Sequence, residues 1–179
     1  MNRNFLYTAS LVLLFLVTSS FNPGSDSVSE ITWQTWGDAI ELNKTEQKKI
    51  FVDLYTDWCG WCKKMDRSTF RDSEVVAYIS ENFIAVKLDG EHKESITYKE
   101  HEFKFVNRGR RGYHELAYSL LEGRMSYPSF VFLNENEQRI TISPGYKDAN
   151  AMLKQLVFIA EEHYKTKNFQ EFSEEYDAN

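Results

Sequence analysis

The chain contains two cysteines, Cys59 and Cys62, and both lie in one C-x-x-C motif, Trp58-Cys59-Gly60-Trp61-Cys62. The motif follows an apolar, β-rich run at residues 50–55 and begins a segment, 60–70, whose pattern predicts a helix. A disulfide that closes so short a loop adds little stability, and no other cysteine is present to staple the chain. We therefore expect a fold that joins a buried strand to a helix through a chemically active cysteine pair.

The position of the pair suits thiol–disulfide exchange, which needs an attacking thiolate and a second thiol that releases the mixed disulfide. At the start of a helix the first cysteine faces free backbone N–H groups and the positive end of the helix dipole. Both lower the pKa of its thiol. Cys59 is therefore the predicted nucleophile and Cys62 the predicted resolving cysteine, which we expect to be the more buried of the two.

Metal binding and an inert structural bridge are the alternative interpretations of a C-x-x-C motif. A structural zinc site needs about four ligands, and thiolates also suit Cu(I). The sequence has no second C-x-x-C motif, and its four histidines are scattered. The strand and helix around the motif favour redox chemistry, while both alternatives stay open. The histidines are His92, His101, His114 and His163.

The order of the remaining elements predicts an α/β fold. Two strands separated by a helical stretch long enough for a crossover indicate a parallel pair, and a later pair of strands separated by a short turn indicates a hairpin. Residues 90–112 are charged and show no clear pattern. The predicted helices are 36–49, 60–70, 73–82, 113–121 and 149–163, and the predicted strands are 50–55, 83–89, 129–133 and 139–142.

Four segments, in this order, resemble the thioredoxin superfamily. Residues 51–63 resemble its strand, active-site and helix segment, 86–89 its next strand, and 126–132 its cis-proline segment; Gly145 stands where the superfamily has a glycine before its final helix. The resemblance implies a thioredoxin fold, which is an α/β fold with a central mixed β-sheet flanked by helices. It also implies an insertion before the cis-proline segment.

The resemblance covers most of the chain and divides it into parts. It implies one thioredoxin-like domain at 31–164 that contains the insertion at about 90–122. The domain is followed by a polar, acidic tail at 165–179, which we expect to be frayed.

The resemblance also implies roles for two residues outside the motif and for their partners. Asp53 lies on the buried strand, where desolvation raises the pKa of a carboxyl group, and it is expected to relay the proton of Cys62 with the support of Lys87. The alternative is a purely structural Asp53–Lys87 pair. A cis Pro128 turns the Tyr127 backbone toward the cysteines, where it can pair with a substrate strand; the alternative is a trans proline at the start of a strand.

The residues around the cysteines are expected to contact substrate. Trp58 is predicted to form a wall beside the nucleophile, with a plain core tryptophan as the alternative. Gly60-Trp61 replaces the Gly-Pro pair of ordinary thioredoxins, so the sequence leaves the redox potential open. Together with Lys63-Lys64, this pair is similar to that of secreted thioredoxin-fold reductases of bacterial envelopes.

The insertion is longer than a compact thioredoxin needs between residues 88 and 126. It is predicted to form a lid or a partner-docking surface near the motif. Its arginine cluster, Arg108, Arg110 and Arg111, would then meet an acidic partner or substrate. The alternative is a solvated charged loop.

The N-terminal residues predict export. Arg3 precedes an apolar run at 5–17 and small residues at 18–20, which is typical of a cleaved signal peptide at 1–20 followed by a polar linker at 21–30. The alternative is an uncleaved anchor. We expect a protein secreted across a membrane into a bacterial periplasm, with no stable membrane insertion after signal cleavage. A net charge of −6 argues against nucleic-acid binding.

The expected function is that of a thiol–disulfide oxidoreductase of the protein-disulfide reductase type, which acts on exported proteins in the reducing or isomerising direction. No flavin or nicotinamide motif is present, so the Cys59–Cys62 pair is the expected redox centre, with no cofactor or metal, and a membrane thiol protein the expected electron donor. The alternatives are a disulfide-forming oxidant with the same site and a non-catalytic metal-binding or adhesive module.

Overall fold

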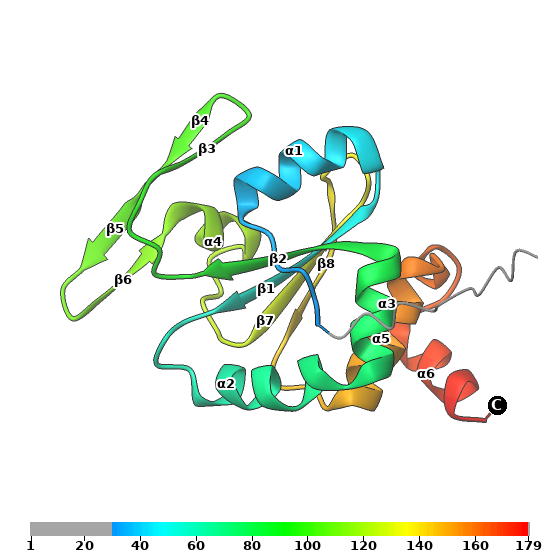
Figure 1. Cartoon of the computed structure of the whole chain (residues 1–179). Coiled ribbons are helices and arrows are strands. Elements are labelled where there is room, and N and C mark those ends of the chain that lie inside the picture. The colour runs from blue at the N-terminus through cyan, green and yellow to red at the C-terminus, as the bar shows by residue number, and fades with distance from the viewer. Residues whose placement is uncertain (1–29, 179) are drawn as a thin grey trace, which may run out of the picture.

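The computed structural model of the protein describes residues 30–178 (Figure 1). The predicted signal peptide and all but the last residue of the predicted linker lie outside these residues. Within them, no helix combines the length and the apolar character needed to cross a membrane. The elements are α1 Trp36–Glu46, β1 Lys49–Tyr55, α2 Gly60–Arg67, η1 Thr69–Arg71, α3 Ser73–Asn82, β2 Phe83–Asp89, β3 Ile96–Tyr98, β4 His101–Phe103, β5 Phe105–Arg108, β6 Arg111–His114, α4 Glu115–Leu120, β7 Ser129–Leu133, β8 Arg139–Pro144, α5 Ala149–Ala160, η2 His163–Lys165 and α6 Phe169–Ala178.

The central sheet has four strands in the order β2-β1-β7-β8. β1 pairs with β2 in parallel and with β7 antiparallel, and β7 pairs with β8 antiparallel. This mixed sheet confirms the predicted architecture. The register of β1 places Asp53 opposite Lys87 of β2 and Phe130 of β7.

The two faces of the sheet are covered by different helices. Because successive side chains of a strand point to opposite faces, Phe51 and Asp53 share one face of β1, and Val52 and Leu54 share the other. Phe51 packs in a core with residues of α2, α3 and α5, whereas Val52 and Leu54 pack with residues of α1 and α4. Figure 1 shows these helices on the two sides of the sheet. Asp53 therefore lies on the face that carries the C-x-x-C helix.

The insertion forms two β-hairpins followed by a short helix. The hairpins occupy the segment in which the sequence showed no clear pattern. β3 pairs with β4, and β5 pairs with β6. The predicted helix at 113–121 begins later than expected because Tyr113 pairs with Val106 in the second hairpin. His114 then caps α4 by accepting a hydrogen bond from the Leu116 N–H at 3.2 Å.

The C-terminal tail is helical and packed, so the expectation of a frayed tail is wrong. Phe172 of α6 is buried, and its ring centroid lies 5.2 Å from that of Phe158 on α5. Lys154 of α5 forms an ion pair with Asp177 at 2.7 Å. Although the tail is acidic, an apolar stripe at helical spacing outweighs its charge.

Candidate active site

Cys59 and Cys62 form a disulfide at the N-terminus of α2. Cys59 is the N-cap residue of the helix, and its sulfur accepts a hydrogen bond from the Cys62 N–H at 3.1 Å. The prediction that the motif begins a helix is confirmed. When the bond is reduced, the same N–H and the helix dipole favour a thiolate on Cys59.

Both cysteines are buried in the disulfide form. Cys59 is 5% exposed and Cys62 is 3% exposed, so the expected difference between them is small in this state. The N-cap position is what distinguishes Cys59. Its role as the nucleophile stays a prediction.

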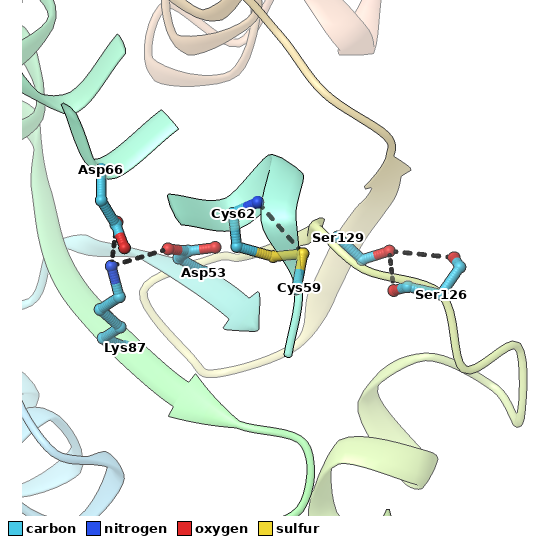
Figure 2. The surroundings of a disulfide bond; sticks show 7 residues. All are labelled: Asp53, Cys59, Cys62, Asp66, Lys87, Ser126 and Ser129. Atoms are coloured by element: carbon cyan, nitrogen blue, oxygen red, sulfur yellow. Dashed lines mark hydrogen bonds and ion pairs between the residues drawn. A yellow bond between two sulfur atoms is a disulfide. The ribbon is translucent and has the colours of Figure 1, made fainter. Parts of the chain in front are cut away.

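Asp53 is buried beneath the disulfide. Its carboxylate is 2% exposed, and in Figure 2 it lies between Lys87 and Cys62, toward whose side chain it points. Its Oδ1 atom has no hydrogen-bond partner among the described residues. Burial raises the pKa of Asp53 to about 7, although the positive charge of Lys87 opposes the shift. A carboxyl group with this pKa can accept or release a proton near neutral pH.

Lys87 connects Asp53 to a second carboxylate. Its ammonium group lies 3.5 Å from Asp53 Oδ2 and also donates a hydrogen bond to Asp66 of α2. The predicted Asp53–Lys87 contact is therefore confirmed. The side chain of Asp66 is 37% exposed, so Lys87 connects the buried Asp53 to a carboxylate that contacts solvent. Sequence analysis missed Asp66, although its position four residues after Cys62 places it one helical turn away on the same face.

The Tyr127–Pro128 peptide bond is cis, so the alternative of a trans proline is wrong. The Pro128 carbonyl accepts a hydrogen bond from the Gly145 N–H at 2.8 Å. On the other flank, Ser129 Oγ donates to the Ser126 carbonyl at 2.7 Å, and Figure 2 shows this serine pair across the disulfide from Asp53. Both serines were missed as part of the site. The cis-proline segment is thus held from two sides, next to the cysteines.

Trp58 is a surface residue and not a core tryptophan. It is 48% exposed, and its Nε1 donates a hydrogen bond to Glu91 at 3.0 Å. The guanidinium carbon of Arg111 lies 4.0 Å from the centroid of its ring, and the Tyr127 ring meets it edge-on at 5.9 Å. The insertion therefore contacts the residue beside Cys59 through Glu91 and Arg111. No local pattern pointed to either contact, because both bridge segments that are distant in sequence.

Trp61 is the second exposed aromatic residue of the C-x-x-C motif. It is 56% exposed, and its ring lies 5.1 Å from that of Tyr146. The Lys64 ammonium lies over both rings, 5.0 Å from the Trp61 centroid and 4.7 Å from the Tyr146 centroid. A Cβ atom at Gly60 would meet nothing within 4 Å. The surface at the C-x-x-C motif is therefore open on the side of Gly60.

Residues 30–178 contain no cluster of three or more histidine, cysteine, aspartate or glutamate side chains suited to hold a metal ion. The rings of His92 and His114 lie 5.6 Å apart. His101 lies against Phe103, and His163 against Phe172. The four histidines are therefore scattered in the fold as they are in the sequence, except that His92 and His114 are neighbours.

Comparison with known sequences gives a family match over most of the chain. The family described as Thioredox_DsbH, a protein of unknown function (DUF255), matches residues 19–175. Spermatogenesis-associated protein 20 of Homo sapiens is 29% identical over 83 residues, which are 46% of this chain and 10% of that protein. The thiol:disulfide interchange protein DsbD of Pseudoalteromonas atlantica is 36% identical over 55 residues, which are 30% of this chain and 9% of that protein. The chain thus spans about a tenth of the length of these curated relatives.

Comparison with solved structures gives the fold. A DsbH oxidoreductase superposes with a TM-score of 0.55 at 15% identity, covering 90% of this chain and 95% of the other. A putative disulphide-isomerase from Bacteroides thetaiotaomicron superposes with a TM-score of 0.54 at 22% identity, covering 79% of this chain and 98% of the other. Likeness at such identities establishes a fold and not a function. The predicted thioredoxin fold is confirmed.

Proposed function

The chain belongs to the Thioredox_DsbH (DUF255) family, and we propose that it is a thiol–disulfide oxidoreductase of the protein-disulfide reductase type. The observation that carries the proposal is the Cys59–Cys62 disulfide at a helix N-terminus, above the buried carboxyl group of Asp53. This arrangement brings together the attacking and resolving thiols that disulfide exchange requires and a carboxyl group that can accept the proton of the resolving thiol.

The reaction in the reducing direction starts from the dithiol. The Cys59 thiolate attacks one sulfur of the substrate disulfide, so that a mixed disulfide forms and the other substrate sulfur leaves as a thiolate. The Cys62 thiol then passes its proton to Asp53 and attacks Cys59 Sγ, which releases the second substrate sulfur. Two electrons have moved to the substrate, and Cys59 and Cys62 are again joined. Isomerisation ends instead when a second substrate thiolate attacks the mixed disulfide.

The groups around the disulfide are suited to an extended substrate chain. The Tyr127–Pro128 peptide bond is cis, and in this proposal the Tyr127 backbone pairs with a substrate strand beside the cysteines. Trp58 and Trp61, which flank Cys59 and Cys62 in the sequence, present exposed aromatic surface. Lys87 contributes indirectly by contacting Asp53.

The compartment and the electron donor are further parts of the proposal. The signal-like segment 1–20 supports export, with the bacterial periplasm as the compartment. The partial likeness to a thiol:disulfide interchange protein supports protein thiols as partners, with a membrane thiol protein returning electrons to the Cys59–Cys62 disulfide.

The first test is the equilibrium reduction potential of the Cys59–Cys62 pair, measured by titration of the purified protein in dithiothreitol and glutathione buffers. A potential near or below about −250 mV supports the reducing direction, and one near about −120 mV identifies an oxidant. Insulin reduction by wild type, Cys59→Ser and Cys62→Ser accompanies the titration. The absence of a reversible two-electron couple would overturn the enzyme proposal and direct attention to Cu(I) and zinc binding.

A further inference from the structure

The second hairpin of the insertion, formed by β5 and β6, carries charge of one sign. Residues 105–114 include Arg108, Arg110 and Arg111 and neither aspartate nor glutamate. The whole chain carries a net charge of −6, so this hairpin is a local reversal of the protein's overall charge. We call these three side chains the arginine tip.

The guanidinium groups of the arginine tip are not neutralised within the fold. Among residues 30–178, none of the three has a carboxylate oxygen within 4.0 Å, whereas Arg71 and Arg139 pair with Glu30 and Glu122. The first hairpin differs, because Lys99 pairs with Glu137 and Lys104 with Glu102. Carboxylates are therefore present on the insertion, but they do not pair with the arginine tip.

One residue of the arginine tip, Arg111, contacts the candidate active site. Arg111 lies over the ring of Trp58, the residue that precedes Cys59, at 4.0 Å from its centroid. Glu91 is the nearby carboxylate that contacts Trp58, and it accepts the indole N–H. Figure 1 shows the β5–β6 hairpin reaching down toward the loop between β1 and α2.

Backbone contacts fix this position. The Gly90 N–H donates to the Tyr55 carbonyl and the His114 N–H donates to the Gly90 carbonyl, each at 2.8 Å. Gly112 leaves room for the Phe105 ring, because a Cβ atom there would lie 2.2 Å from it. These bonds tie the base of the hairpin to the end of β1, the strand that precedes the cysteines.

From these contacts we propose that the arginine tip binds an acidic segment of the protein whose disulfide is exchanged at Cys59. This inference rests on the proposed function and adds a substrate class to it. Guanidinium groups bind carboxylates through paired hydrogen bonds, and complementary charge at the rim of an interface speeds encounter and selects partners. A segment that flanks the reacting cysteine can reach the tip, because Trp58 links the tip to the disulfide.

The test compares disulfide peptides of one sequence whose flanking positions are acidic, neutral or basic. The value of kcat/KM for their reduction by the full chain is measured with dithiothreitol as donor, at about 0.02 M and about 0.5 M salt. We expect the acidic peptide to be preferred about fivefold over the neutral one at low salt, and the preference to fall below about twofold in Arg108→Gln/Arg110→Gln. The matched control is Lys44→Gln/Lys48→Gln on and after α1, which removes the same charge from another surface and is expected to keep the preference.

The possible outcomes distinguish failure of the docking proposal from failure of the proposed function. Loss of the preference in the arginine variant alone supports docking at the tip. Equal turnover of all three peptides by wild type overturns the docking proposal and leaves the proposed function standing. A loss of preference in the lysine control that equals the loss in the arginine variant has the same meaning. If wild type shows no peptide preference, and only the arginine variant loses binding to vesicles of anionic lipid, the tip binds a lipid surface and the proposal is overturned. Failure to reduce any peptide overturns the proposed function and this inference with it.

Discussion

The ammonium group of Lys87 lies 3.5 Å from Oδ2 of the buried Asp53, on the adjacent strand. Lys87 does not serve Asp53 alone, because it also donates to Asp66. The positive charge is therefore shared, and burial outweighs it in setting the pKa of Asp53 at about 7.

The first prediction concerns stability. The pKa of Asp53 is about 7 in the folded protein and near 3.8 in the ordinary carboxyl group. Between these values the folded state holds a proton that the unfolded state has lost, so the Asp53 contribution to stability is full below about pH 4, falls as pH rises, and levels off above about pH 7. Asp53→Asn, which stays neutral, should therefore be more stable than wild type at pH 8, with an upper limit of about 4 kcal/mol.

This gain is measured by chemical denaturation of the disulfide forms at pH 4 and pH 8. The two proteins should differ little at the lower pH. An equal difference at both pH values would show that Asp53 does not titrate in this interval.

The second prediction concerns catalysis. Asp53→Asn removes the proton acceptor for Cys62, so resolution of a Cys59 mixed disulfide should slow by about 100-fold. The wild-type rate should show an inflection near pH 7, where Asp53 ionises, and the variant should lack it. Stopped-flow release of a chromogenic thiol from the mixed disulfide measures both. An unchanged inflection in the variant would assign it to another group.

The third prediction concerns Asp66. Asp66→Asn leaves Lys87 free to contact Asp53 alone and removes a negative charge that raises the pKa of Asp53. The pKa of Asp53 should fall, and the inflection of the resolution rate should move to lower pH. The control is Glu41→Gln, which removes an exposed carboxylate on α1. A shift of equal size in the control would mean that net charge, and not Lys87, is responsible.

The fourth prediction concerns the junction of insertion and site. A Cβ atom at Gly90 would lie 1.9 Å from the Tyr127 hydroxyl group. Gly90→Ala should therefore lower the free energy of unfolding by about 1–3 kcal/mol, through overpacking against Tyr127. In a Tyr127→Ala background the same change should cost much less, which a double-mutant cycle by urea denaturation tests. Additive effects would show that the two residues are not in conflict.

The fifth prediction concerns the C-terminal helix. Phe172→Ala should lower the free energy of unfolding by about 3 kcal/mol, because the side chain is buried between α5 and α6. Phe169 is 40% exposed and lies on the same helix. Phe169→Ala should cost clearly less, and equal losses would contradict the packing seen for α6.

The cysteine pair at a helix start and the buried position of Asp53 beside Lys87 could be predicted because they depend on short segments with strong signals. The strand before the motif and the strand after the next helix are continuous apolar runs, and their parallel register places Asp53 against Lys87. The contacts of Trp58 could not be predicted in the same way. Arg111 reaches it from a hairpin whose strands are four residues long, too short for a period of two to stand out from their charges, and Glu91 reaches it from the turn after β2. For α6 a signal was present in Phe169, Phe172 and Tyr176, but the acidic composition of the tail obscured it.

The chain leaves the central sheet after β2 and returns to it at β7. The two hairpins lie between these strands in the sequence, and the pairings of β2 and β7 with β1 involve no hairpin residue. The surface that we propose selects partners and the register that places Asp53 against Lys87 are therefore separable parts of one chain. Replacement of the β5–β6 hairpin by a shorter turn would leave these strand pairings and the packing of α4 in place. In a lineage of such proteins, partner choice can diversify while the redox machinery stays the same.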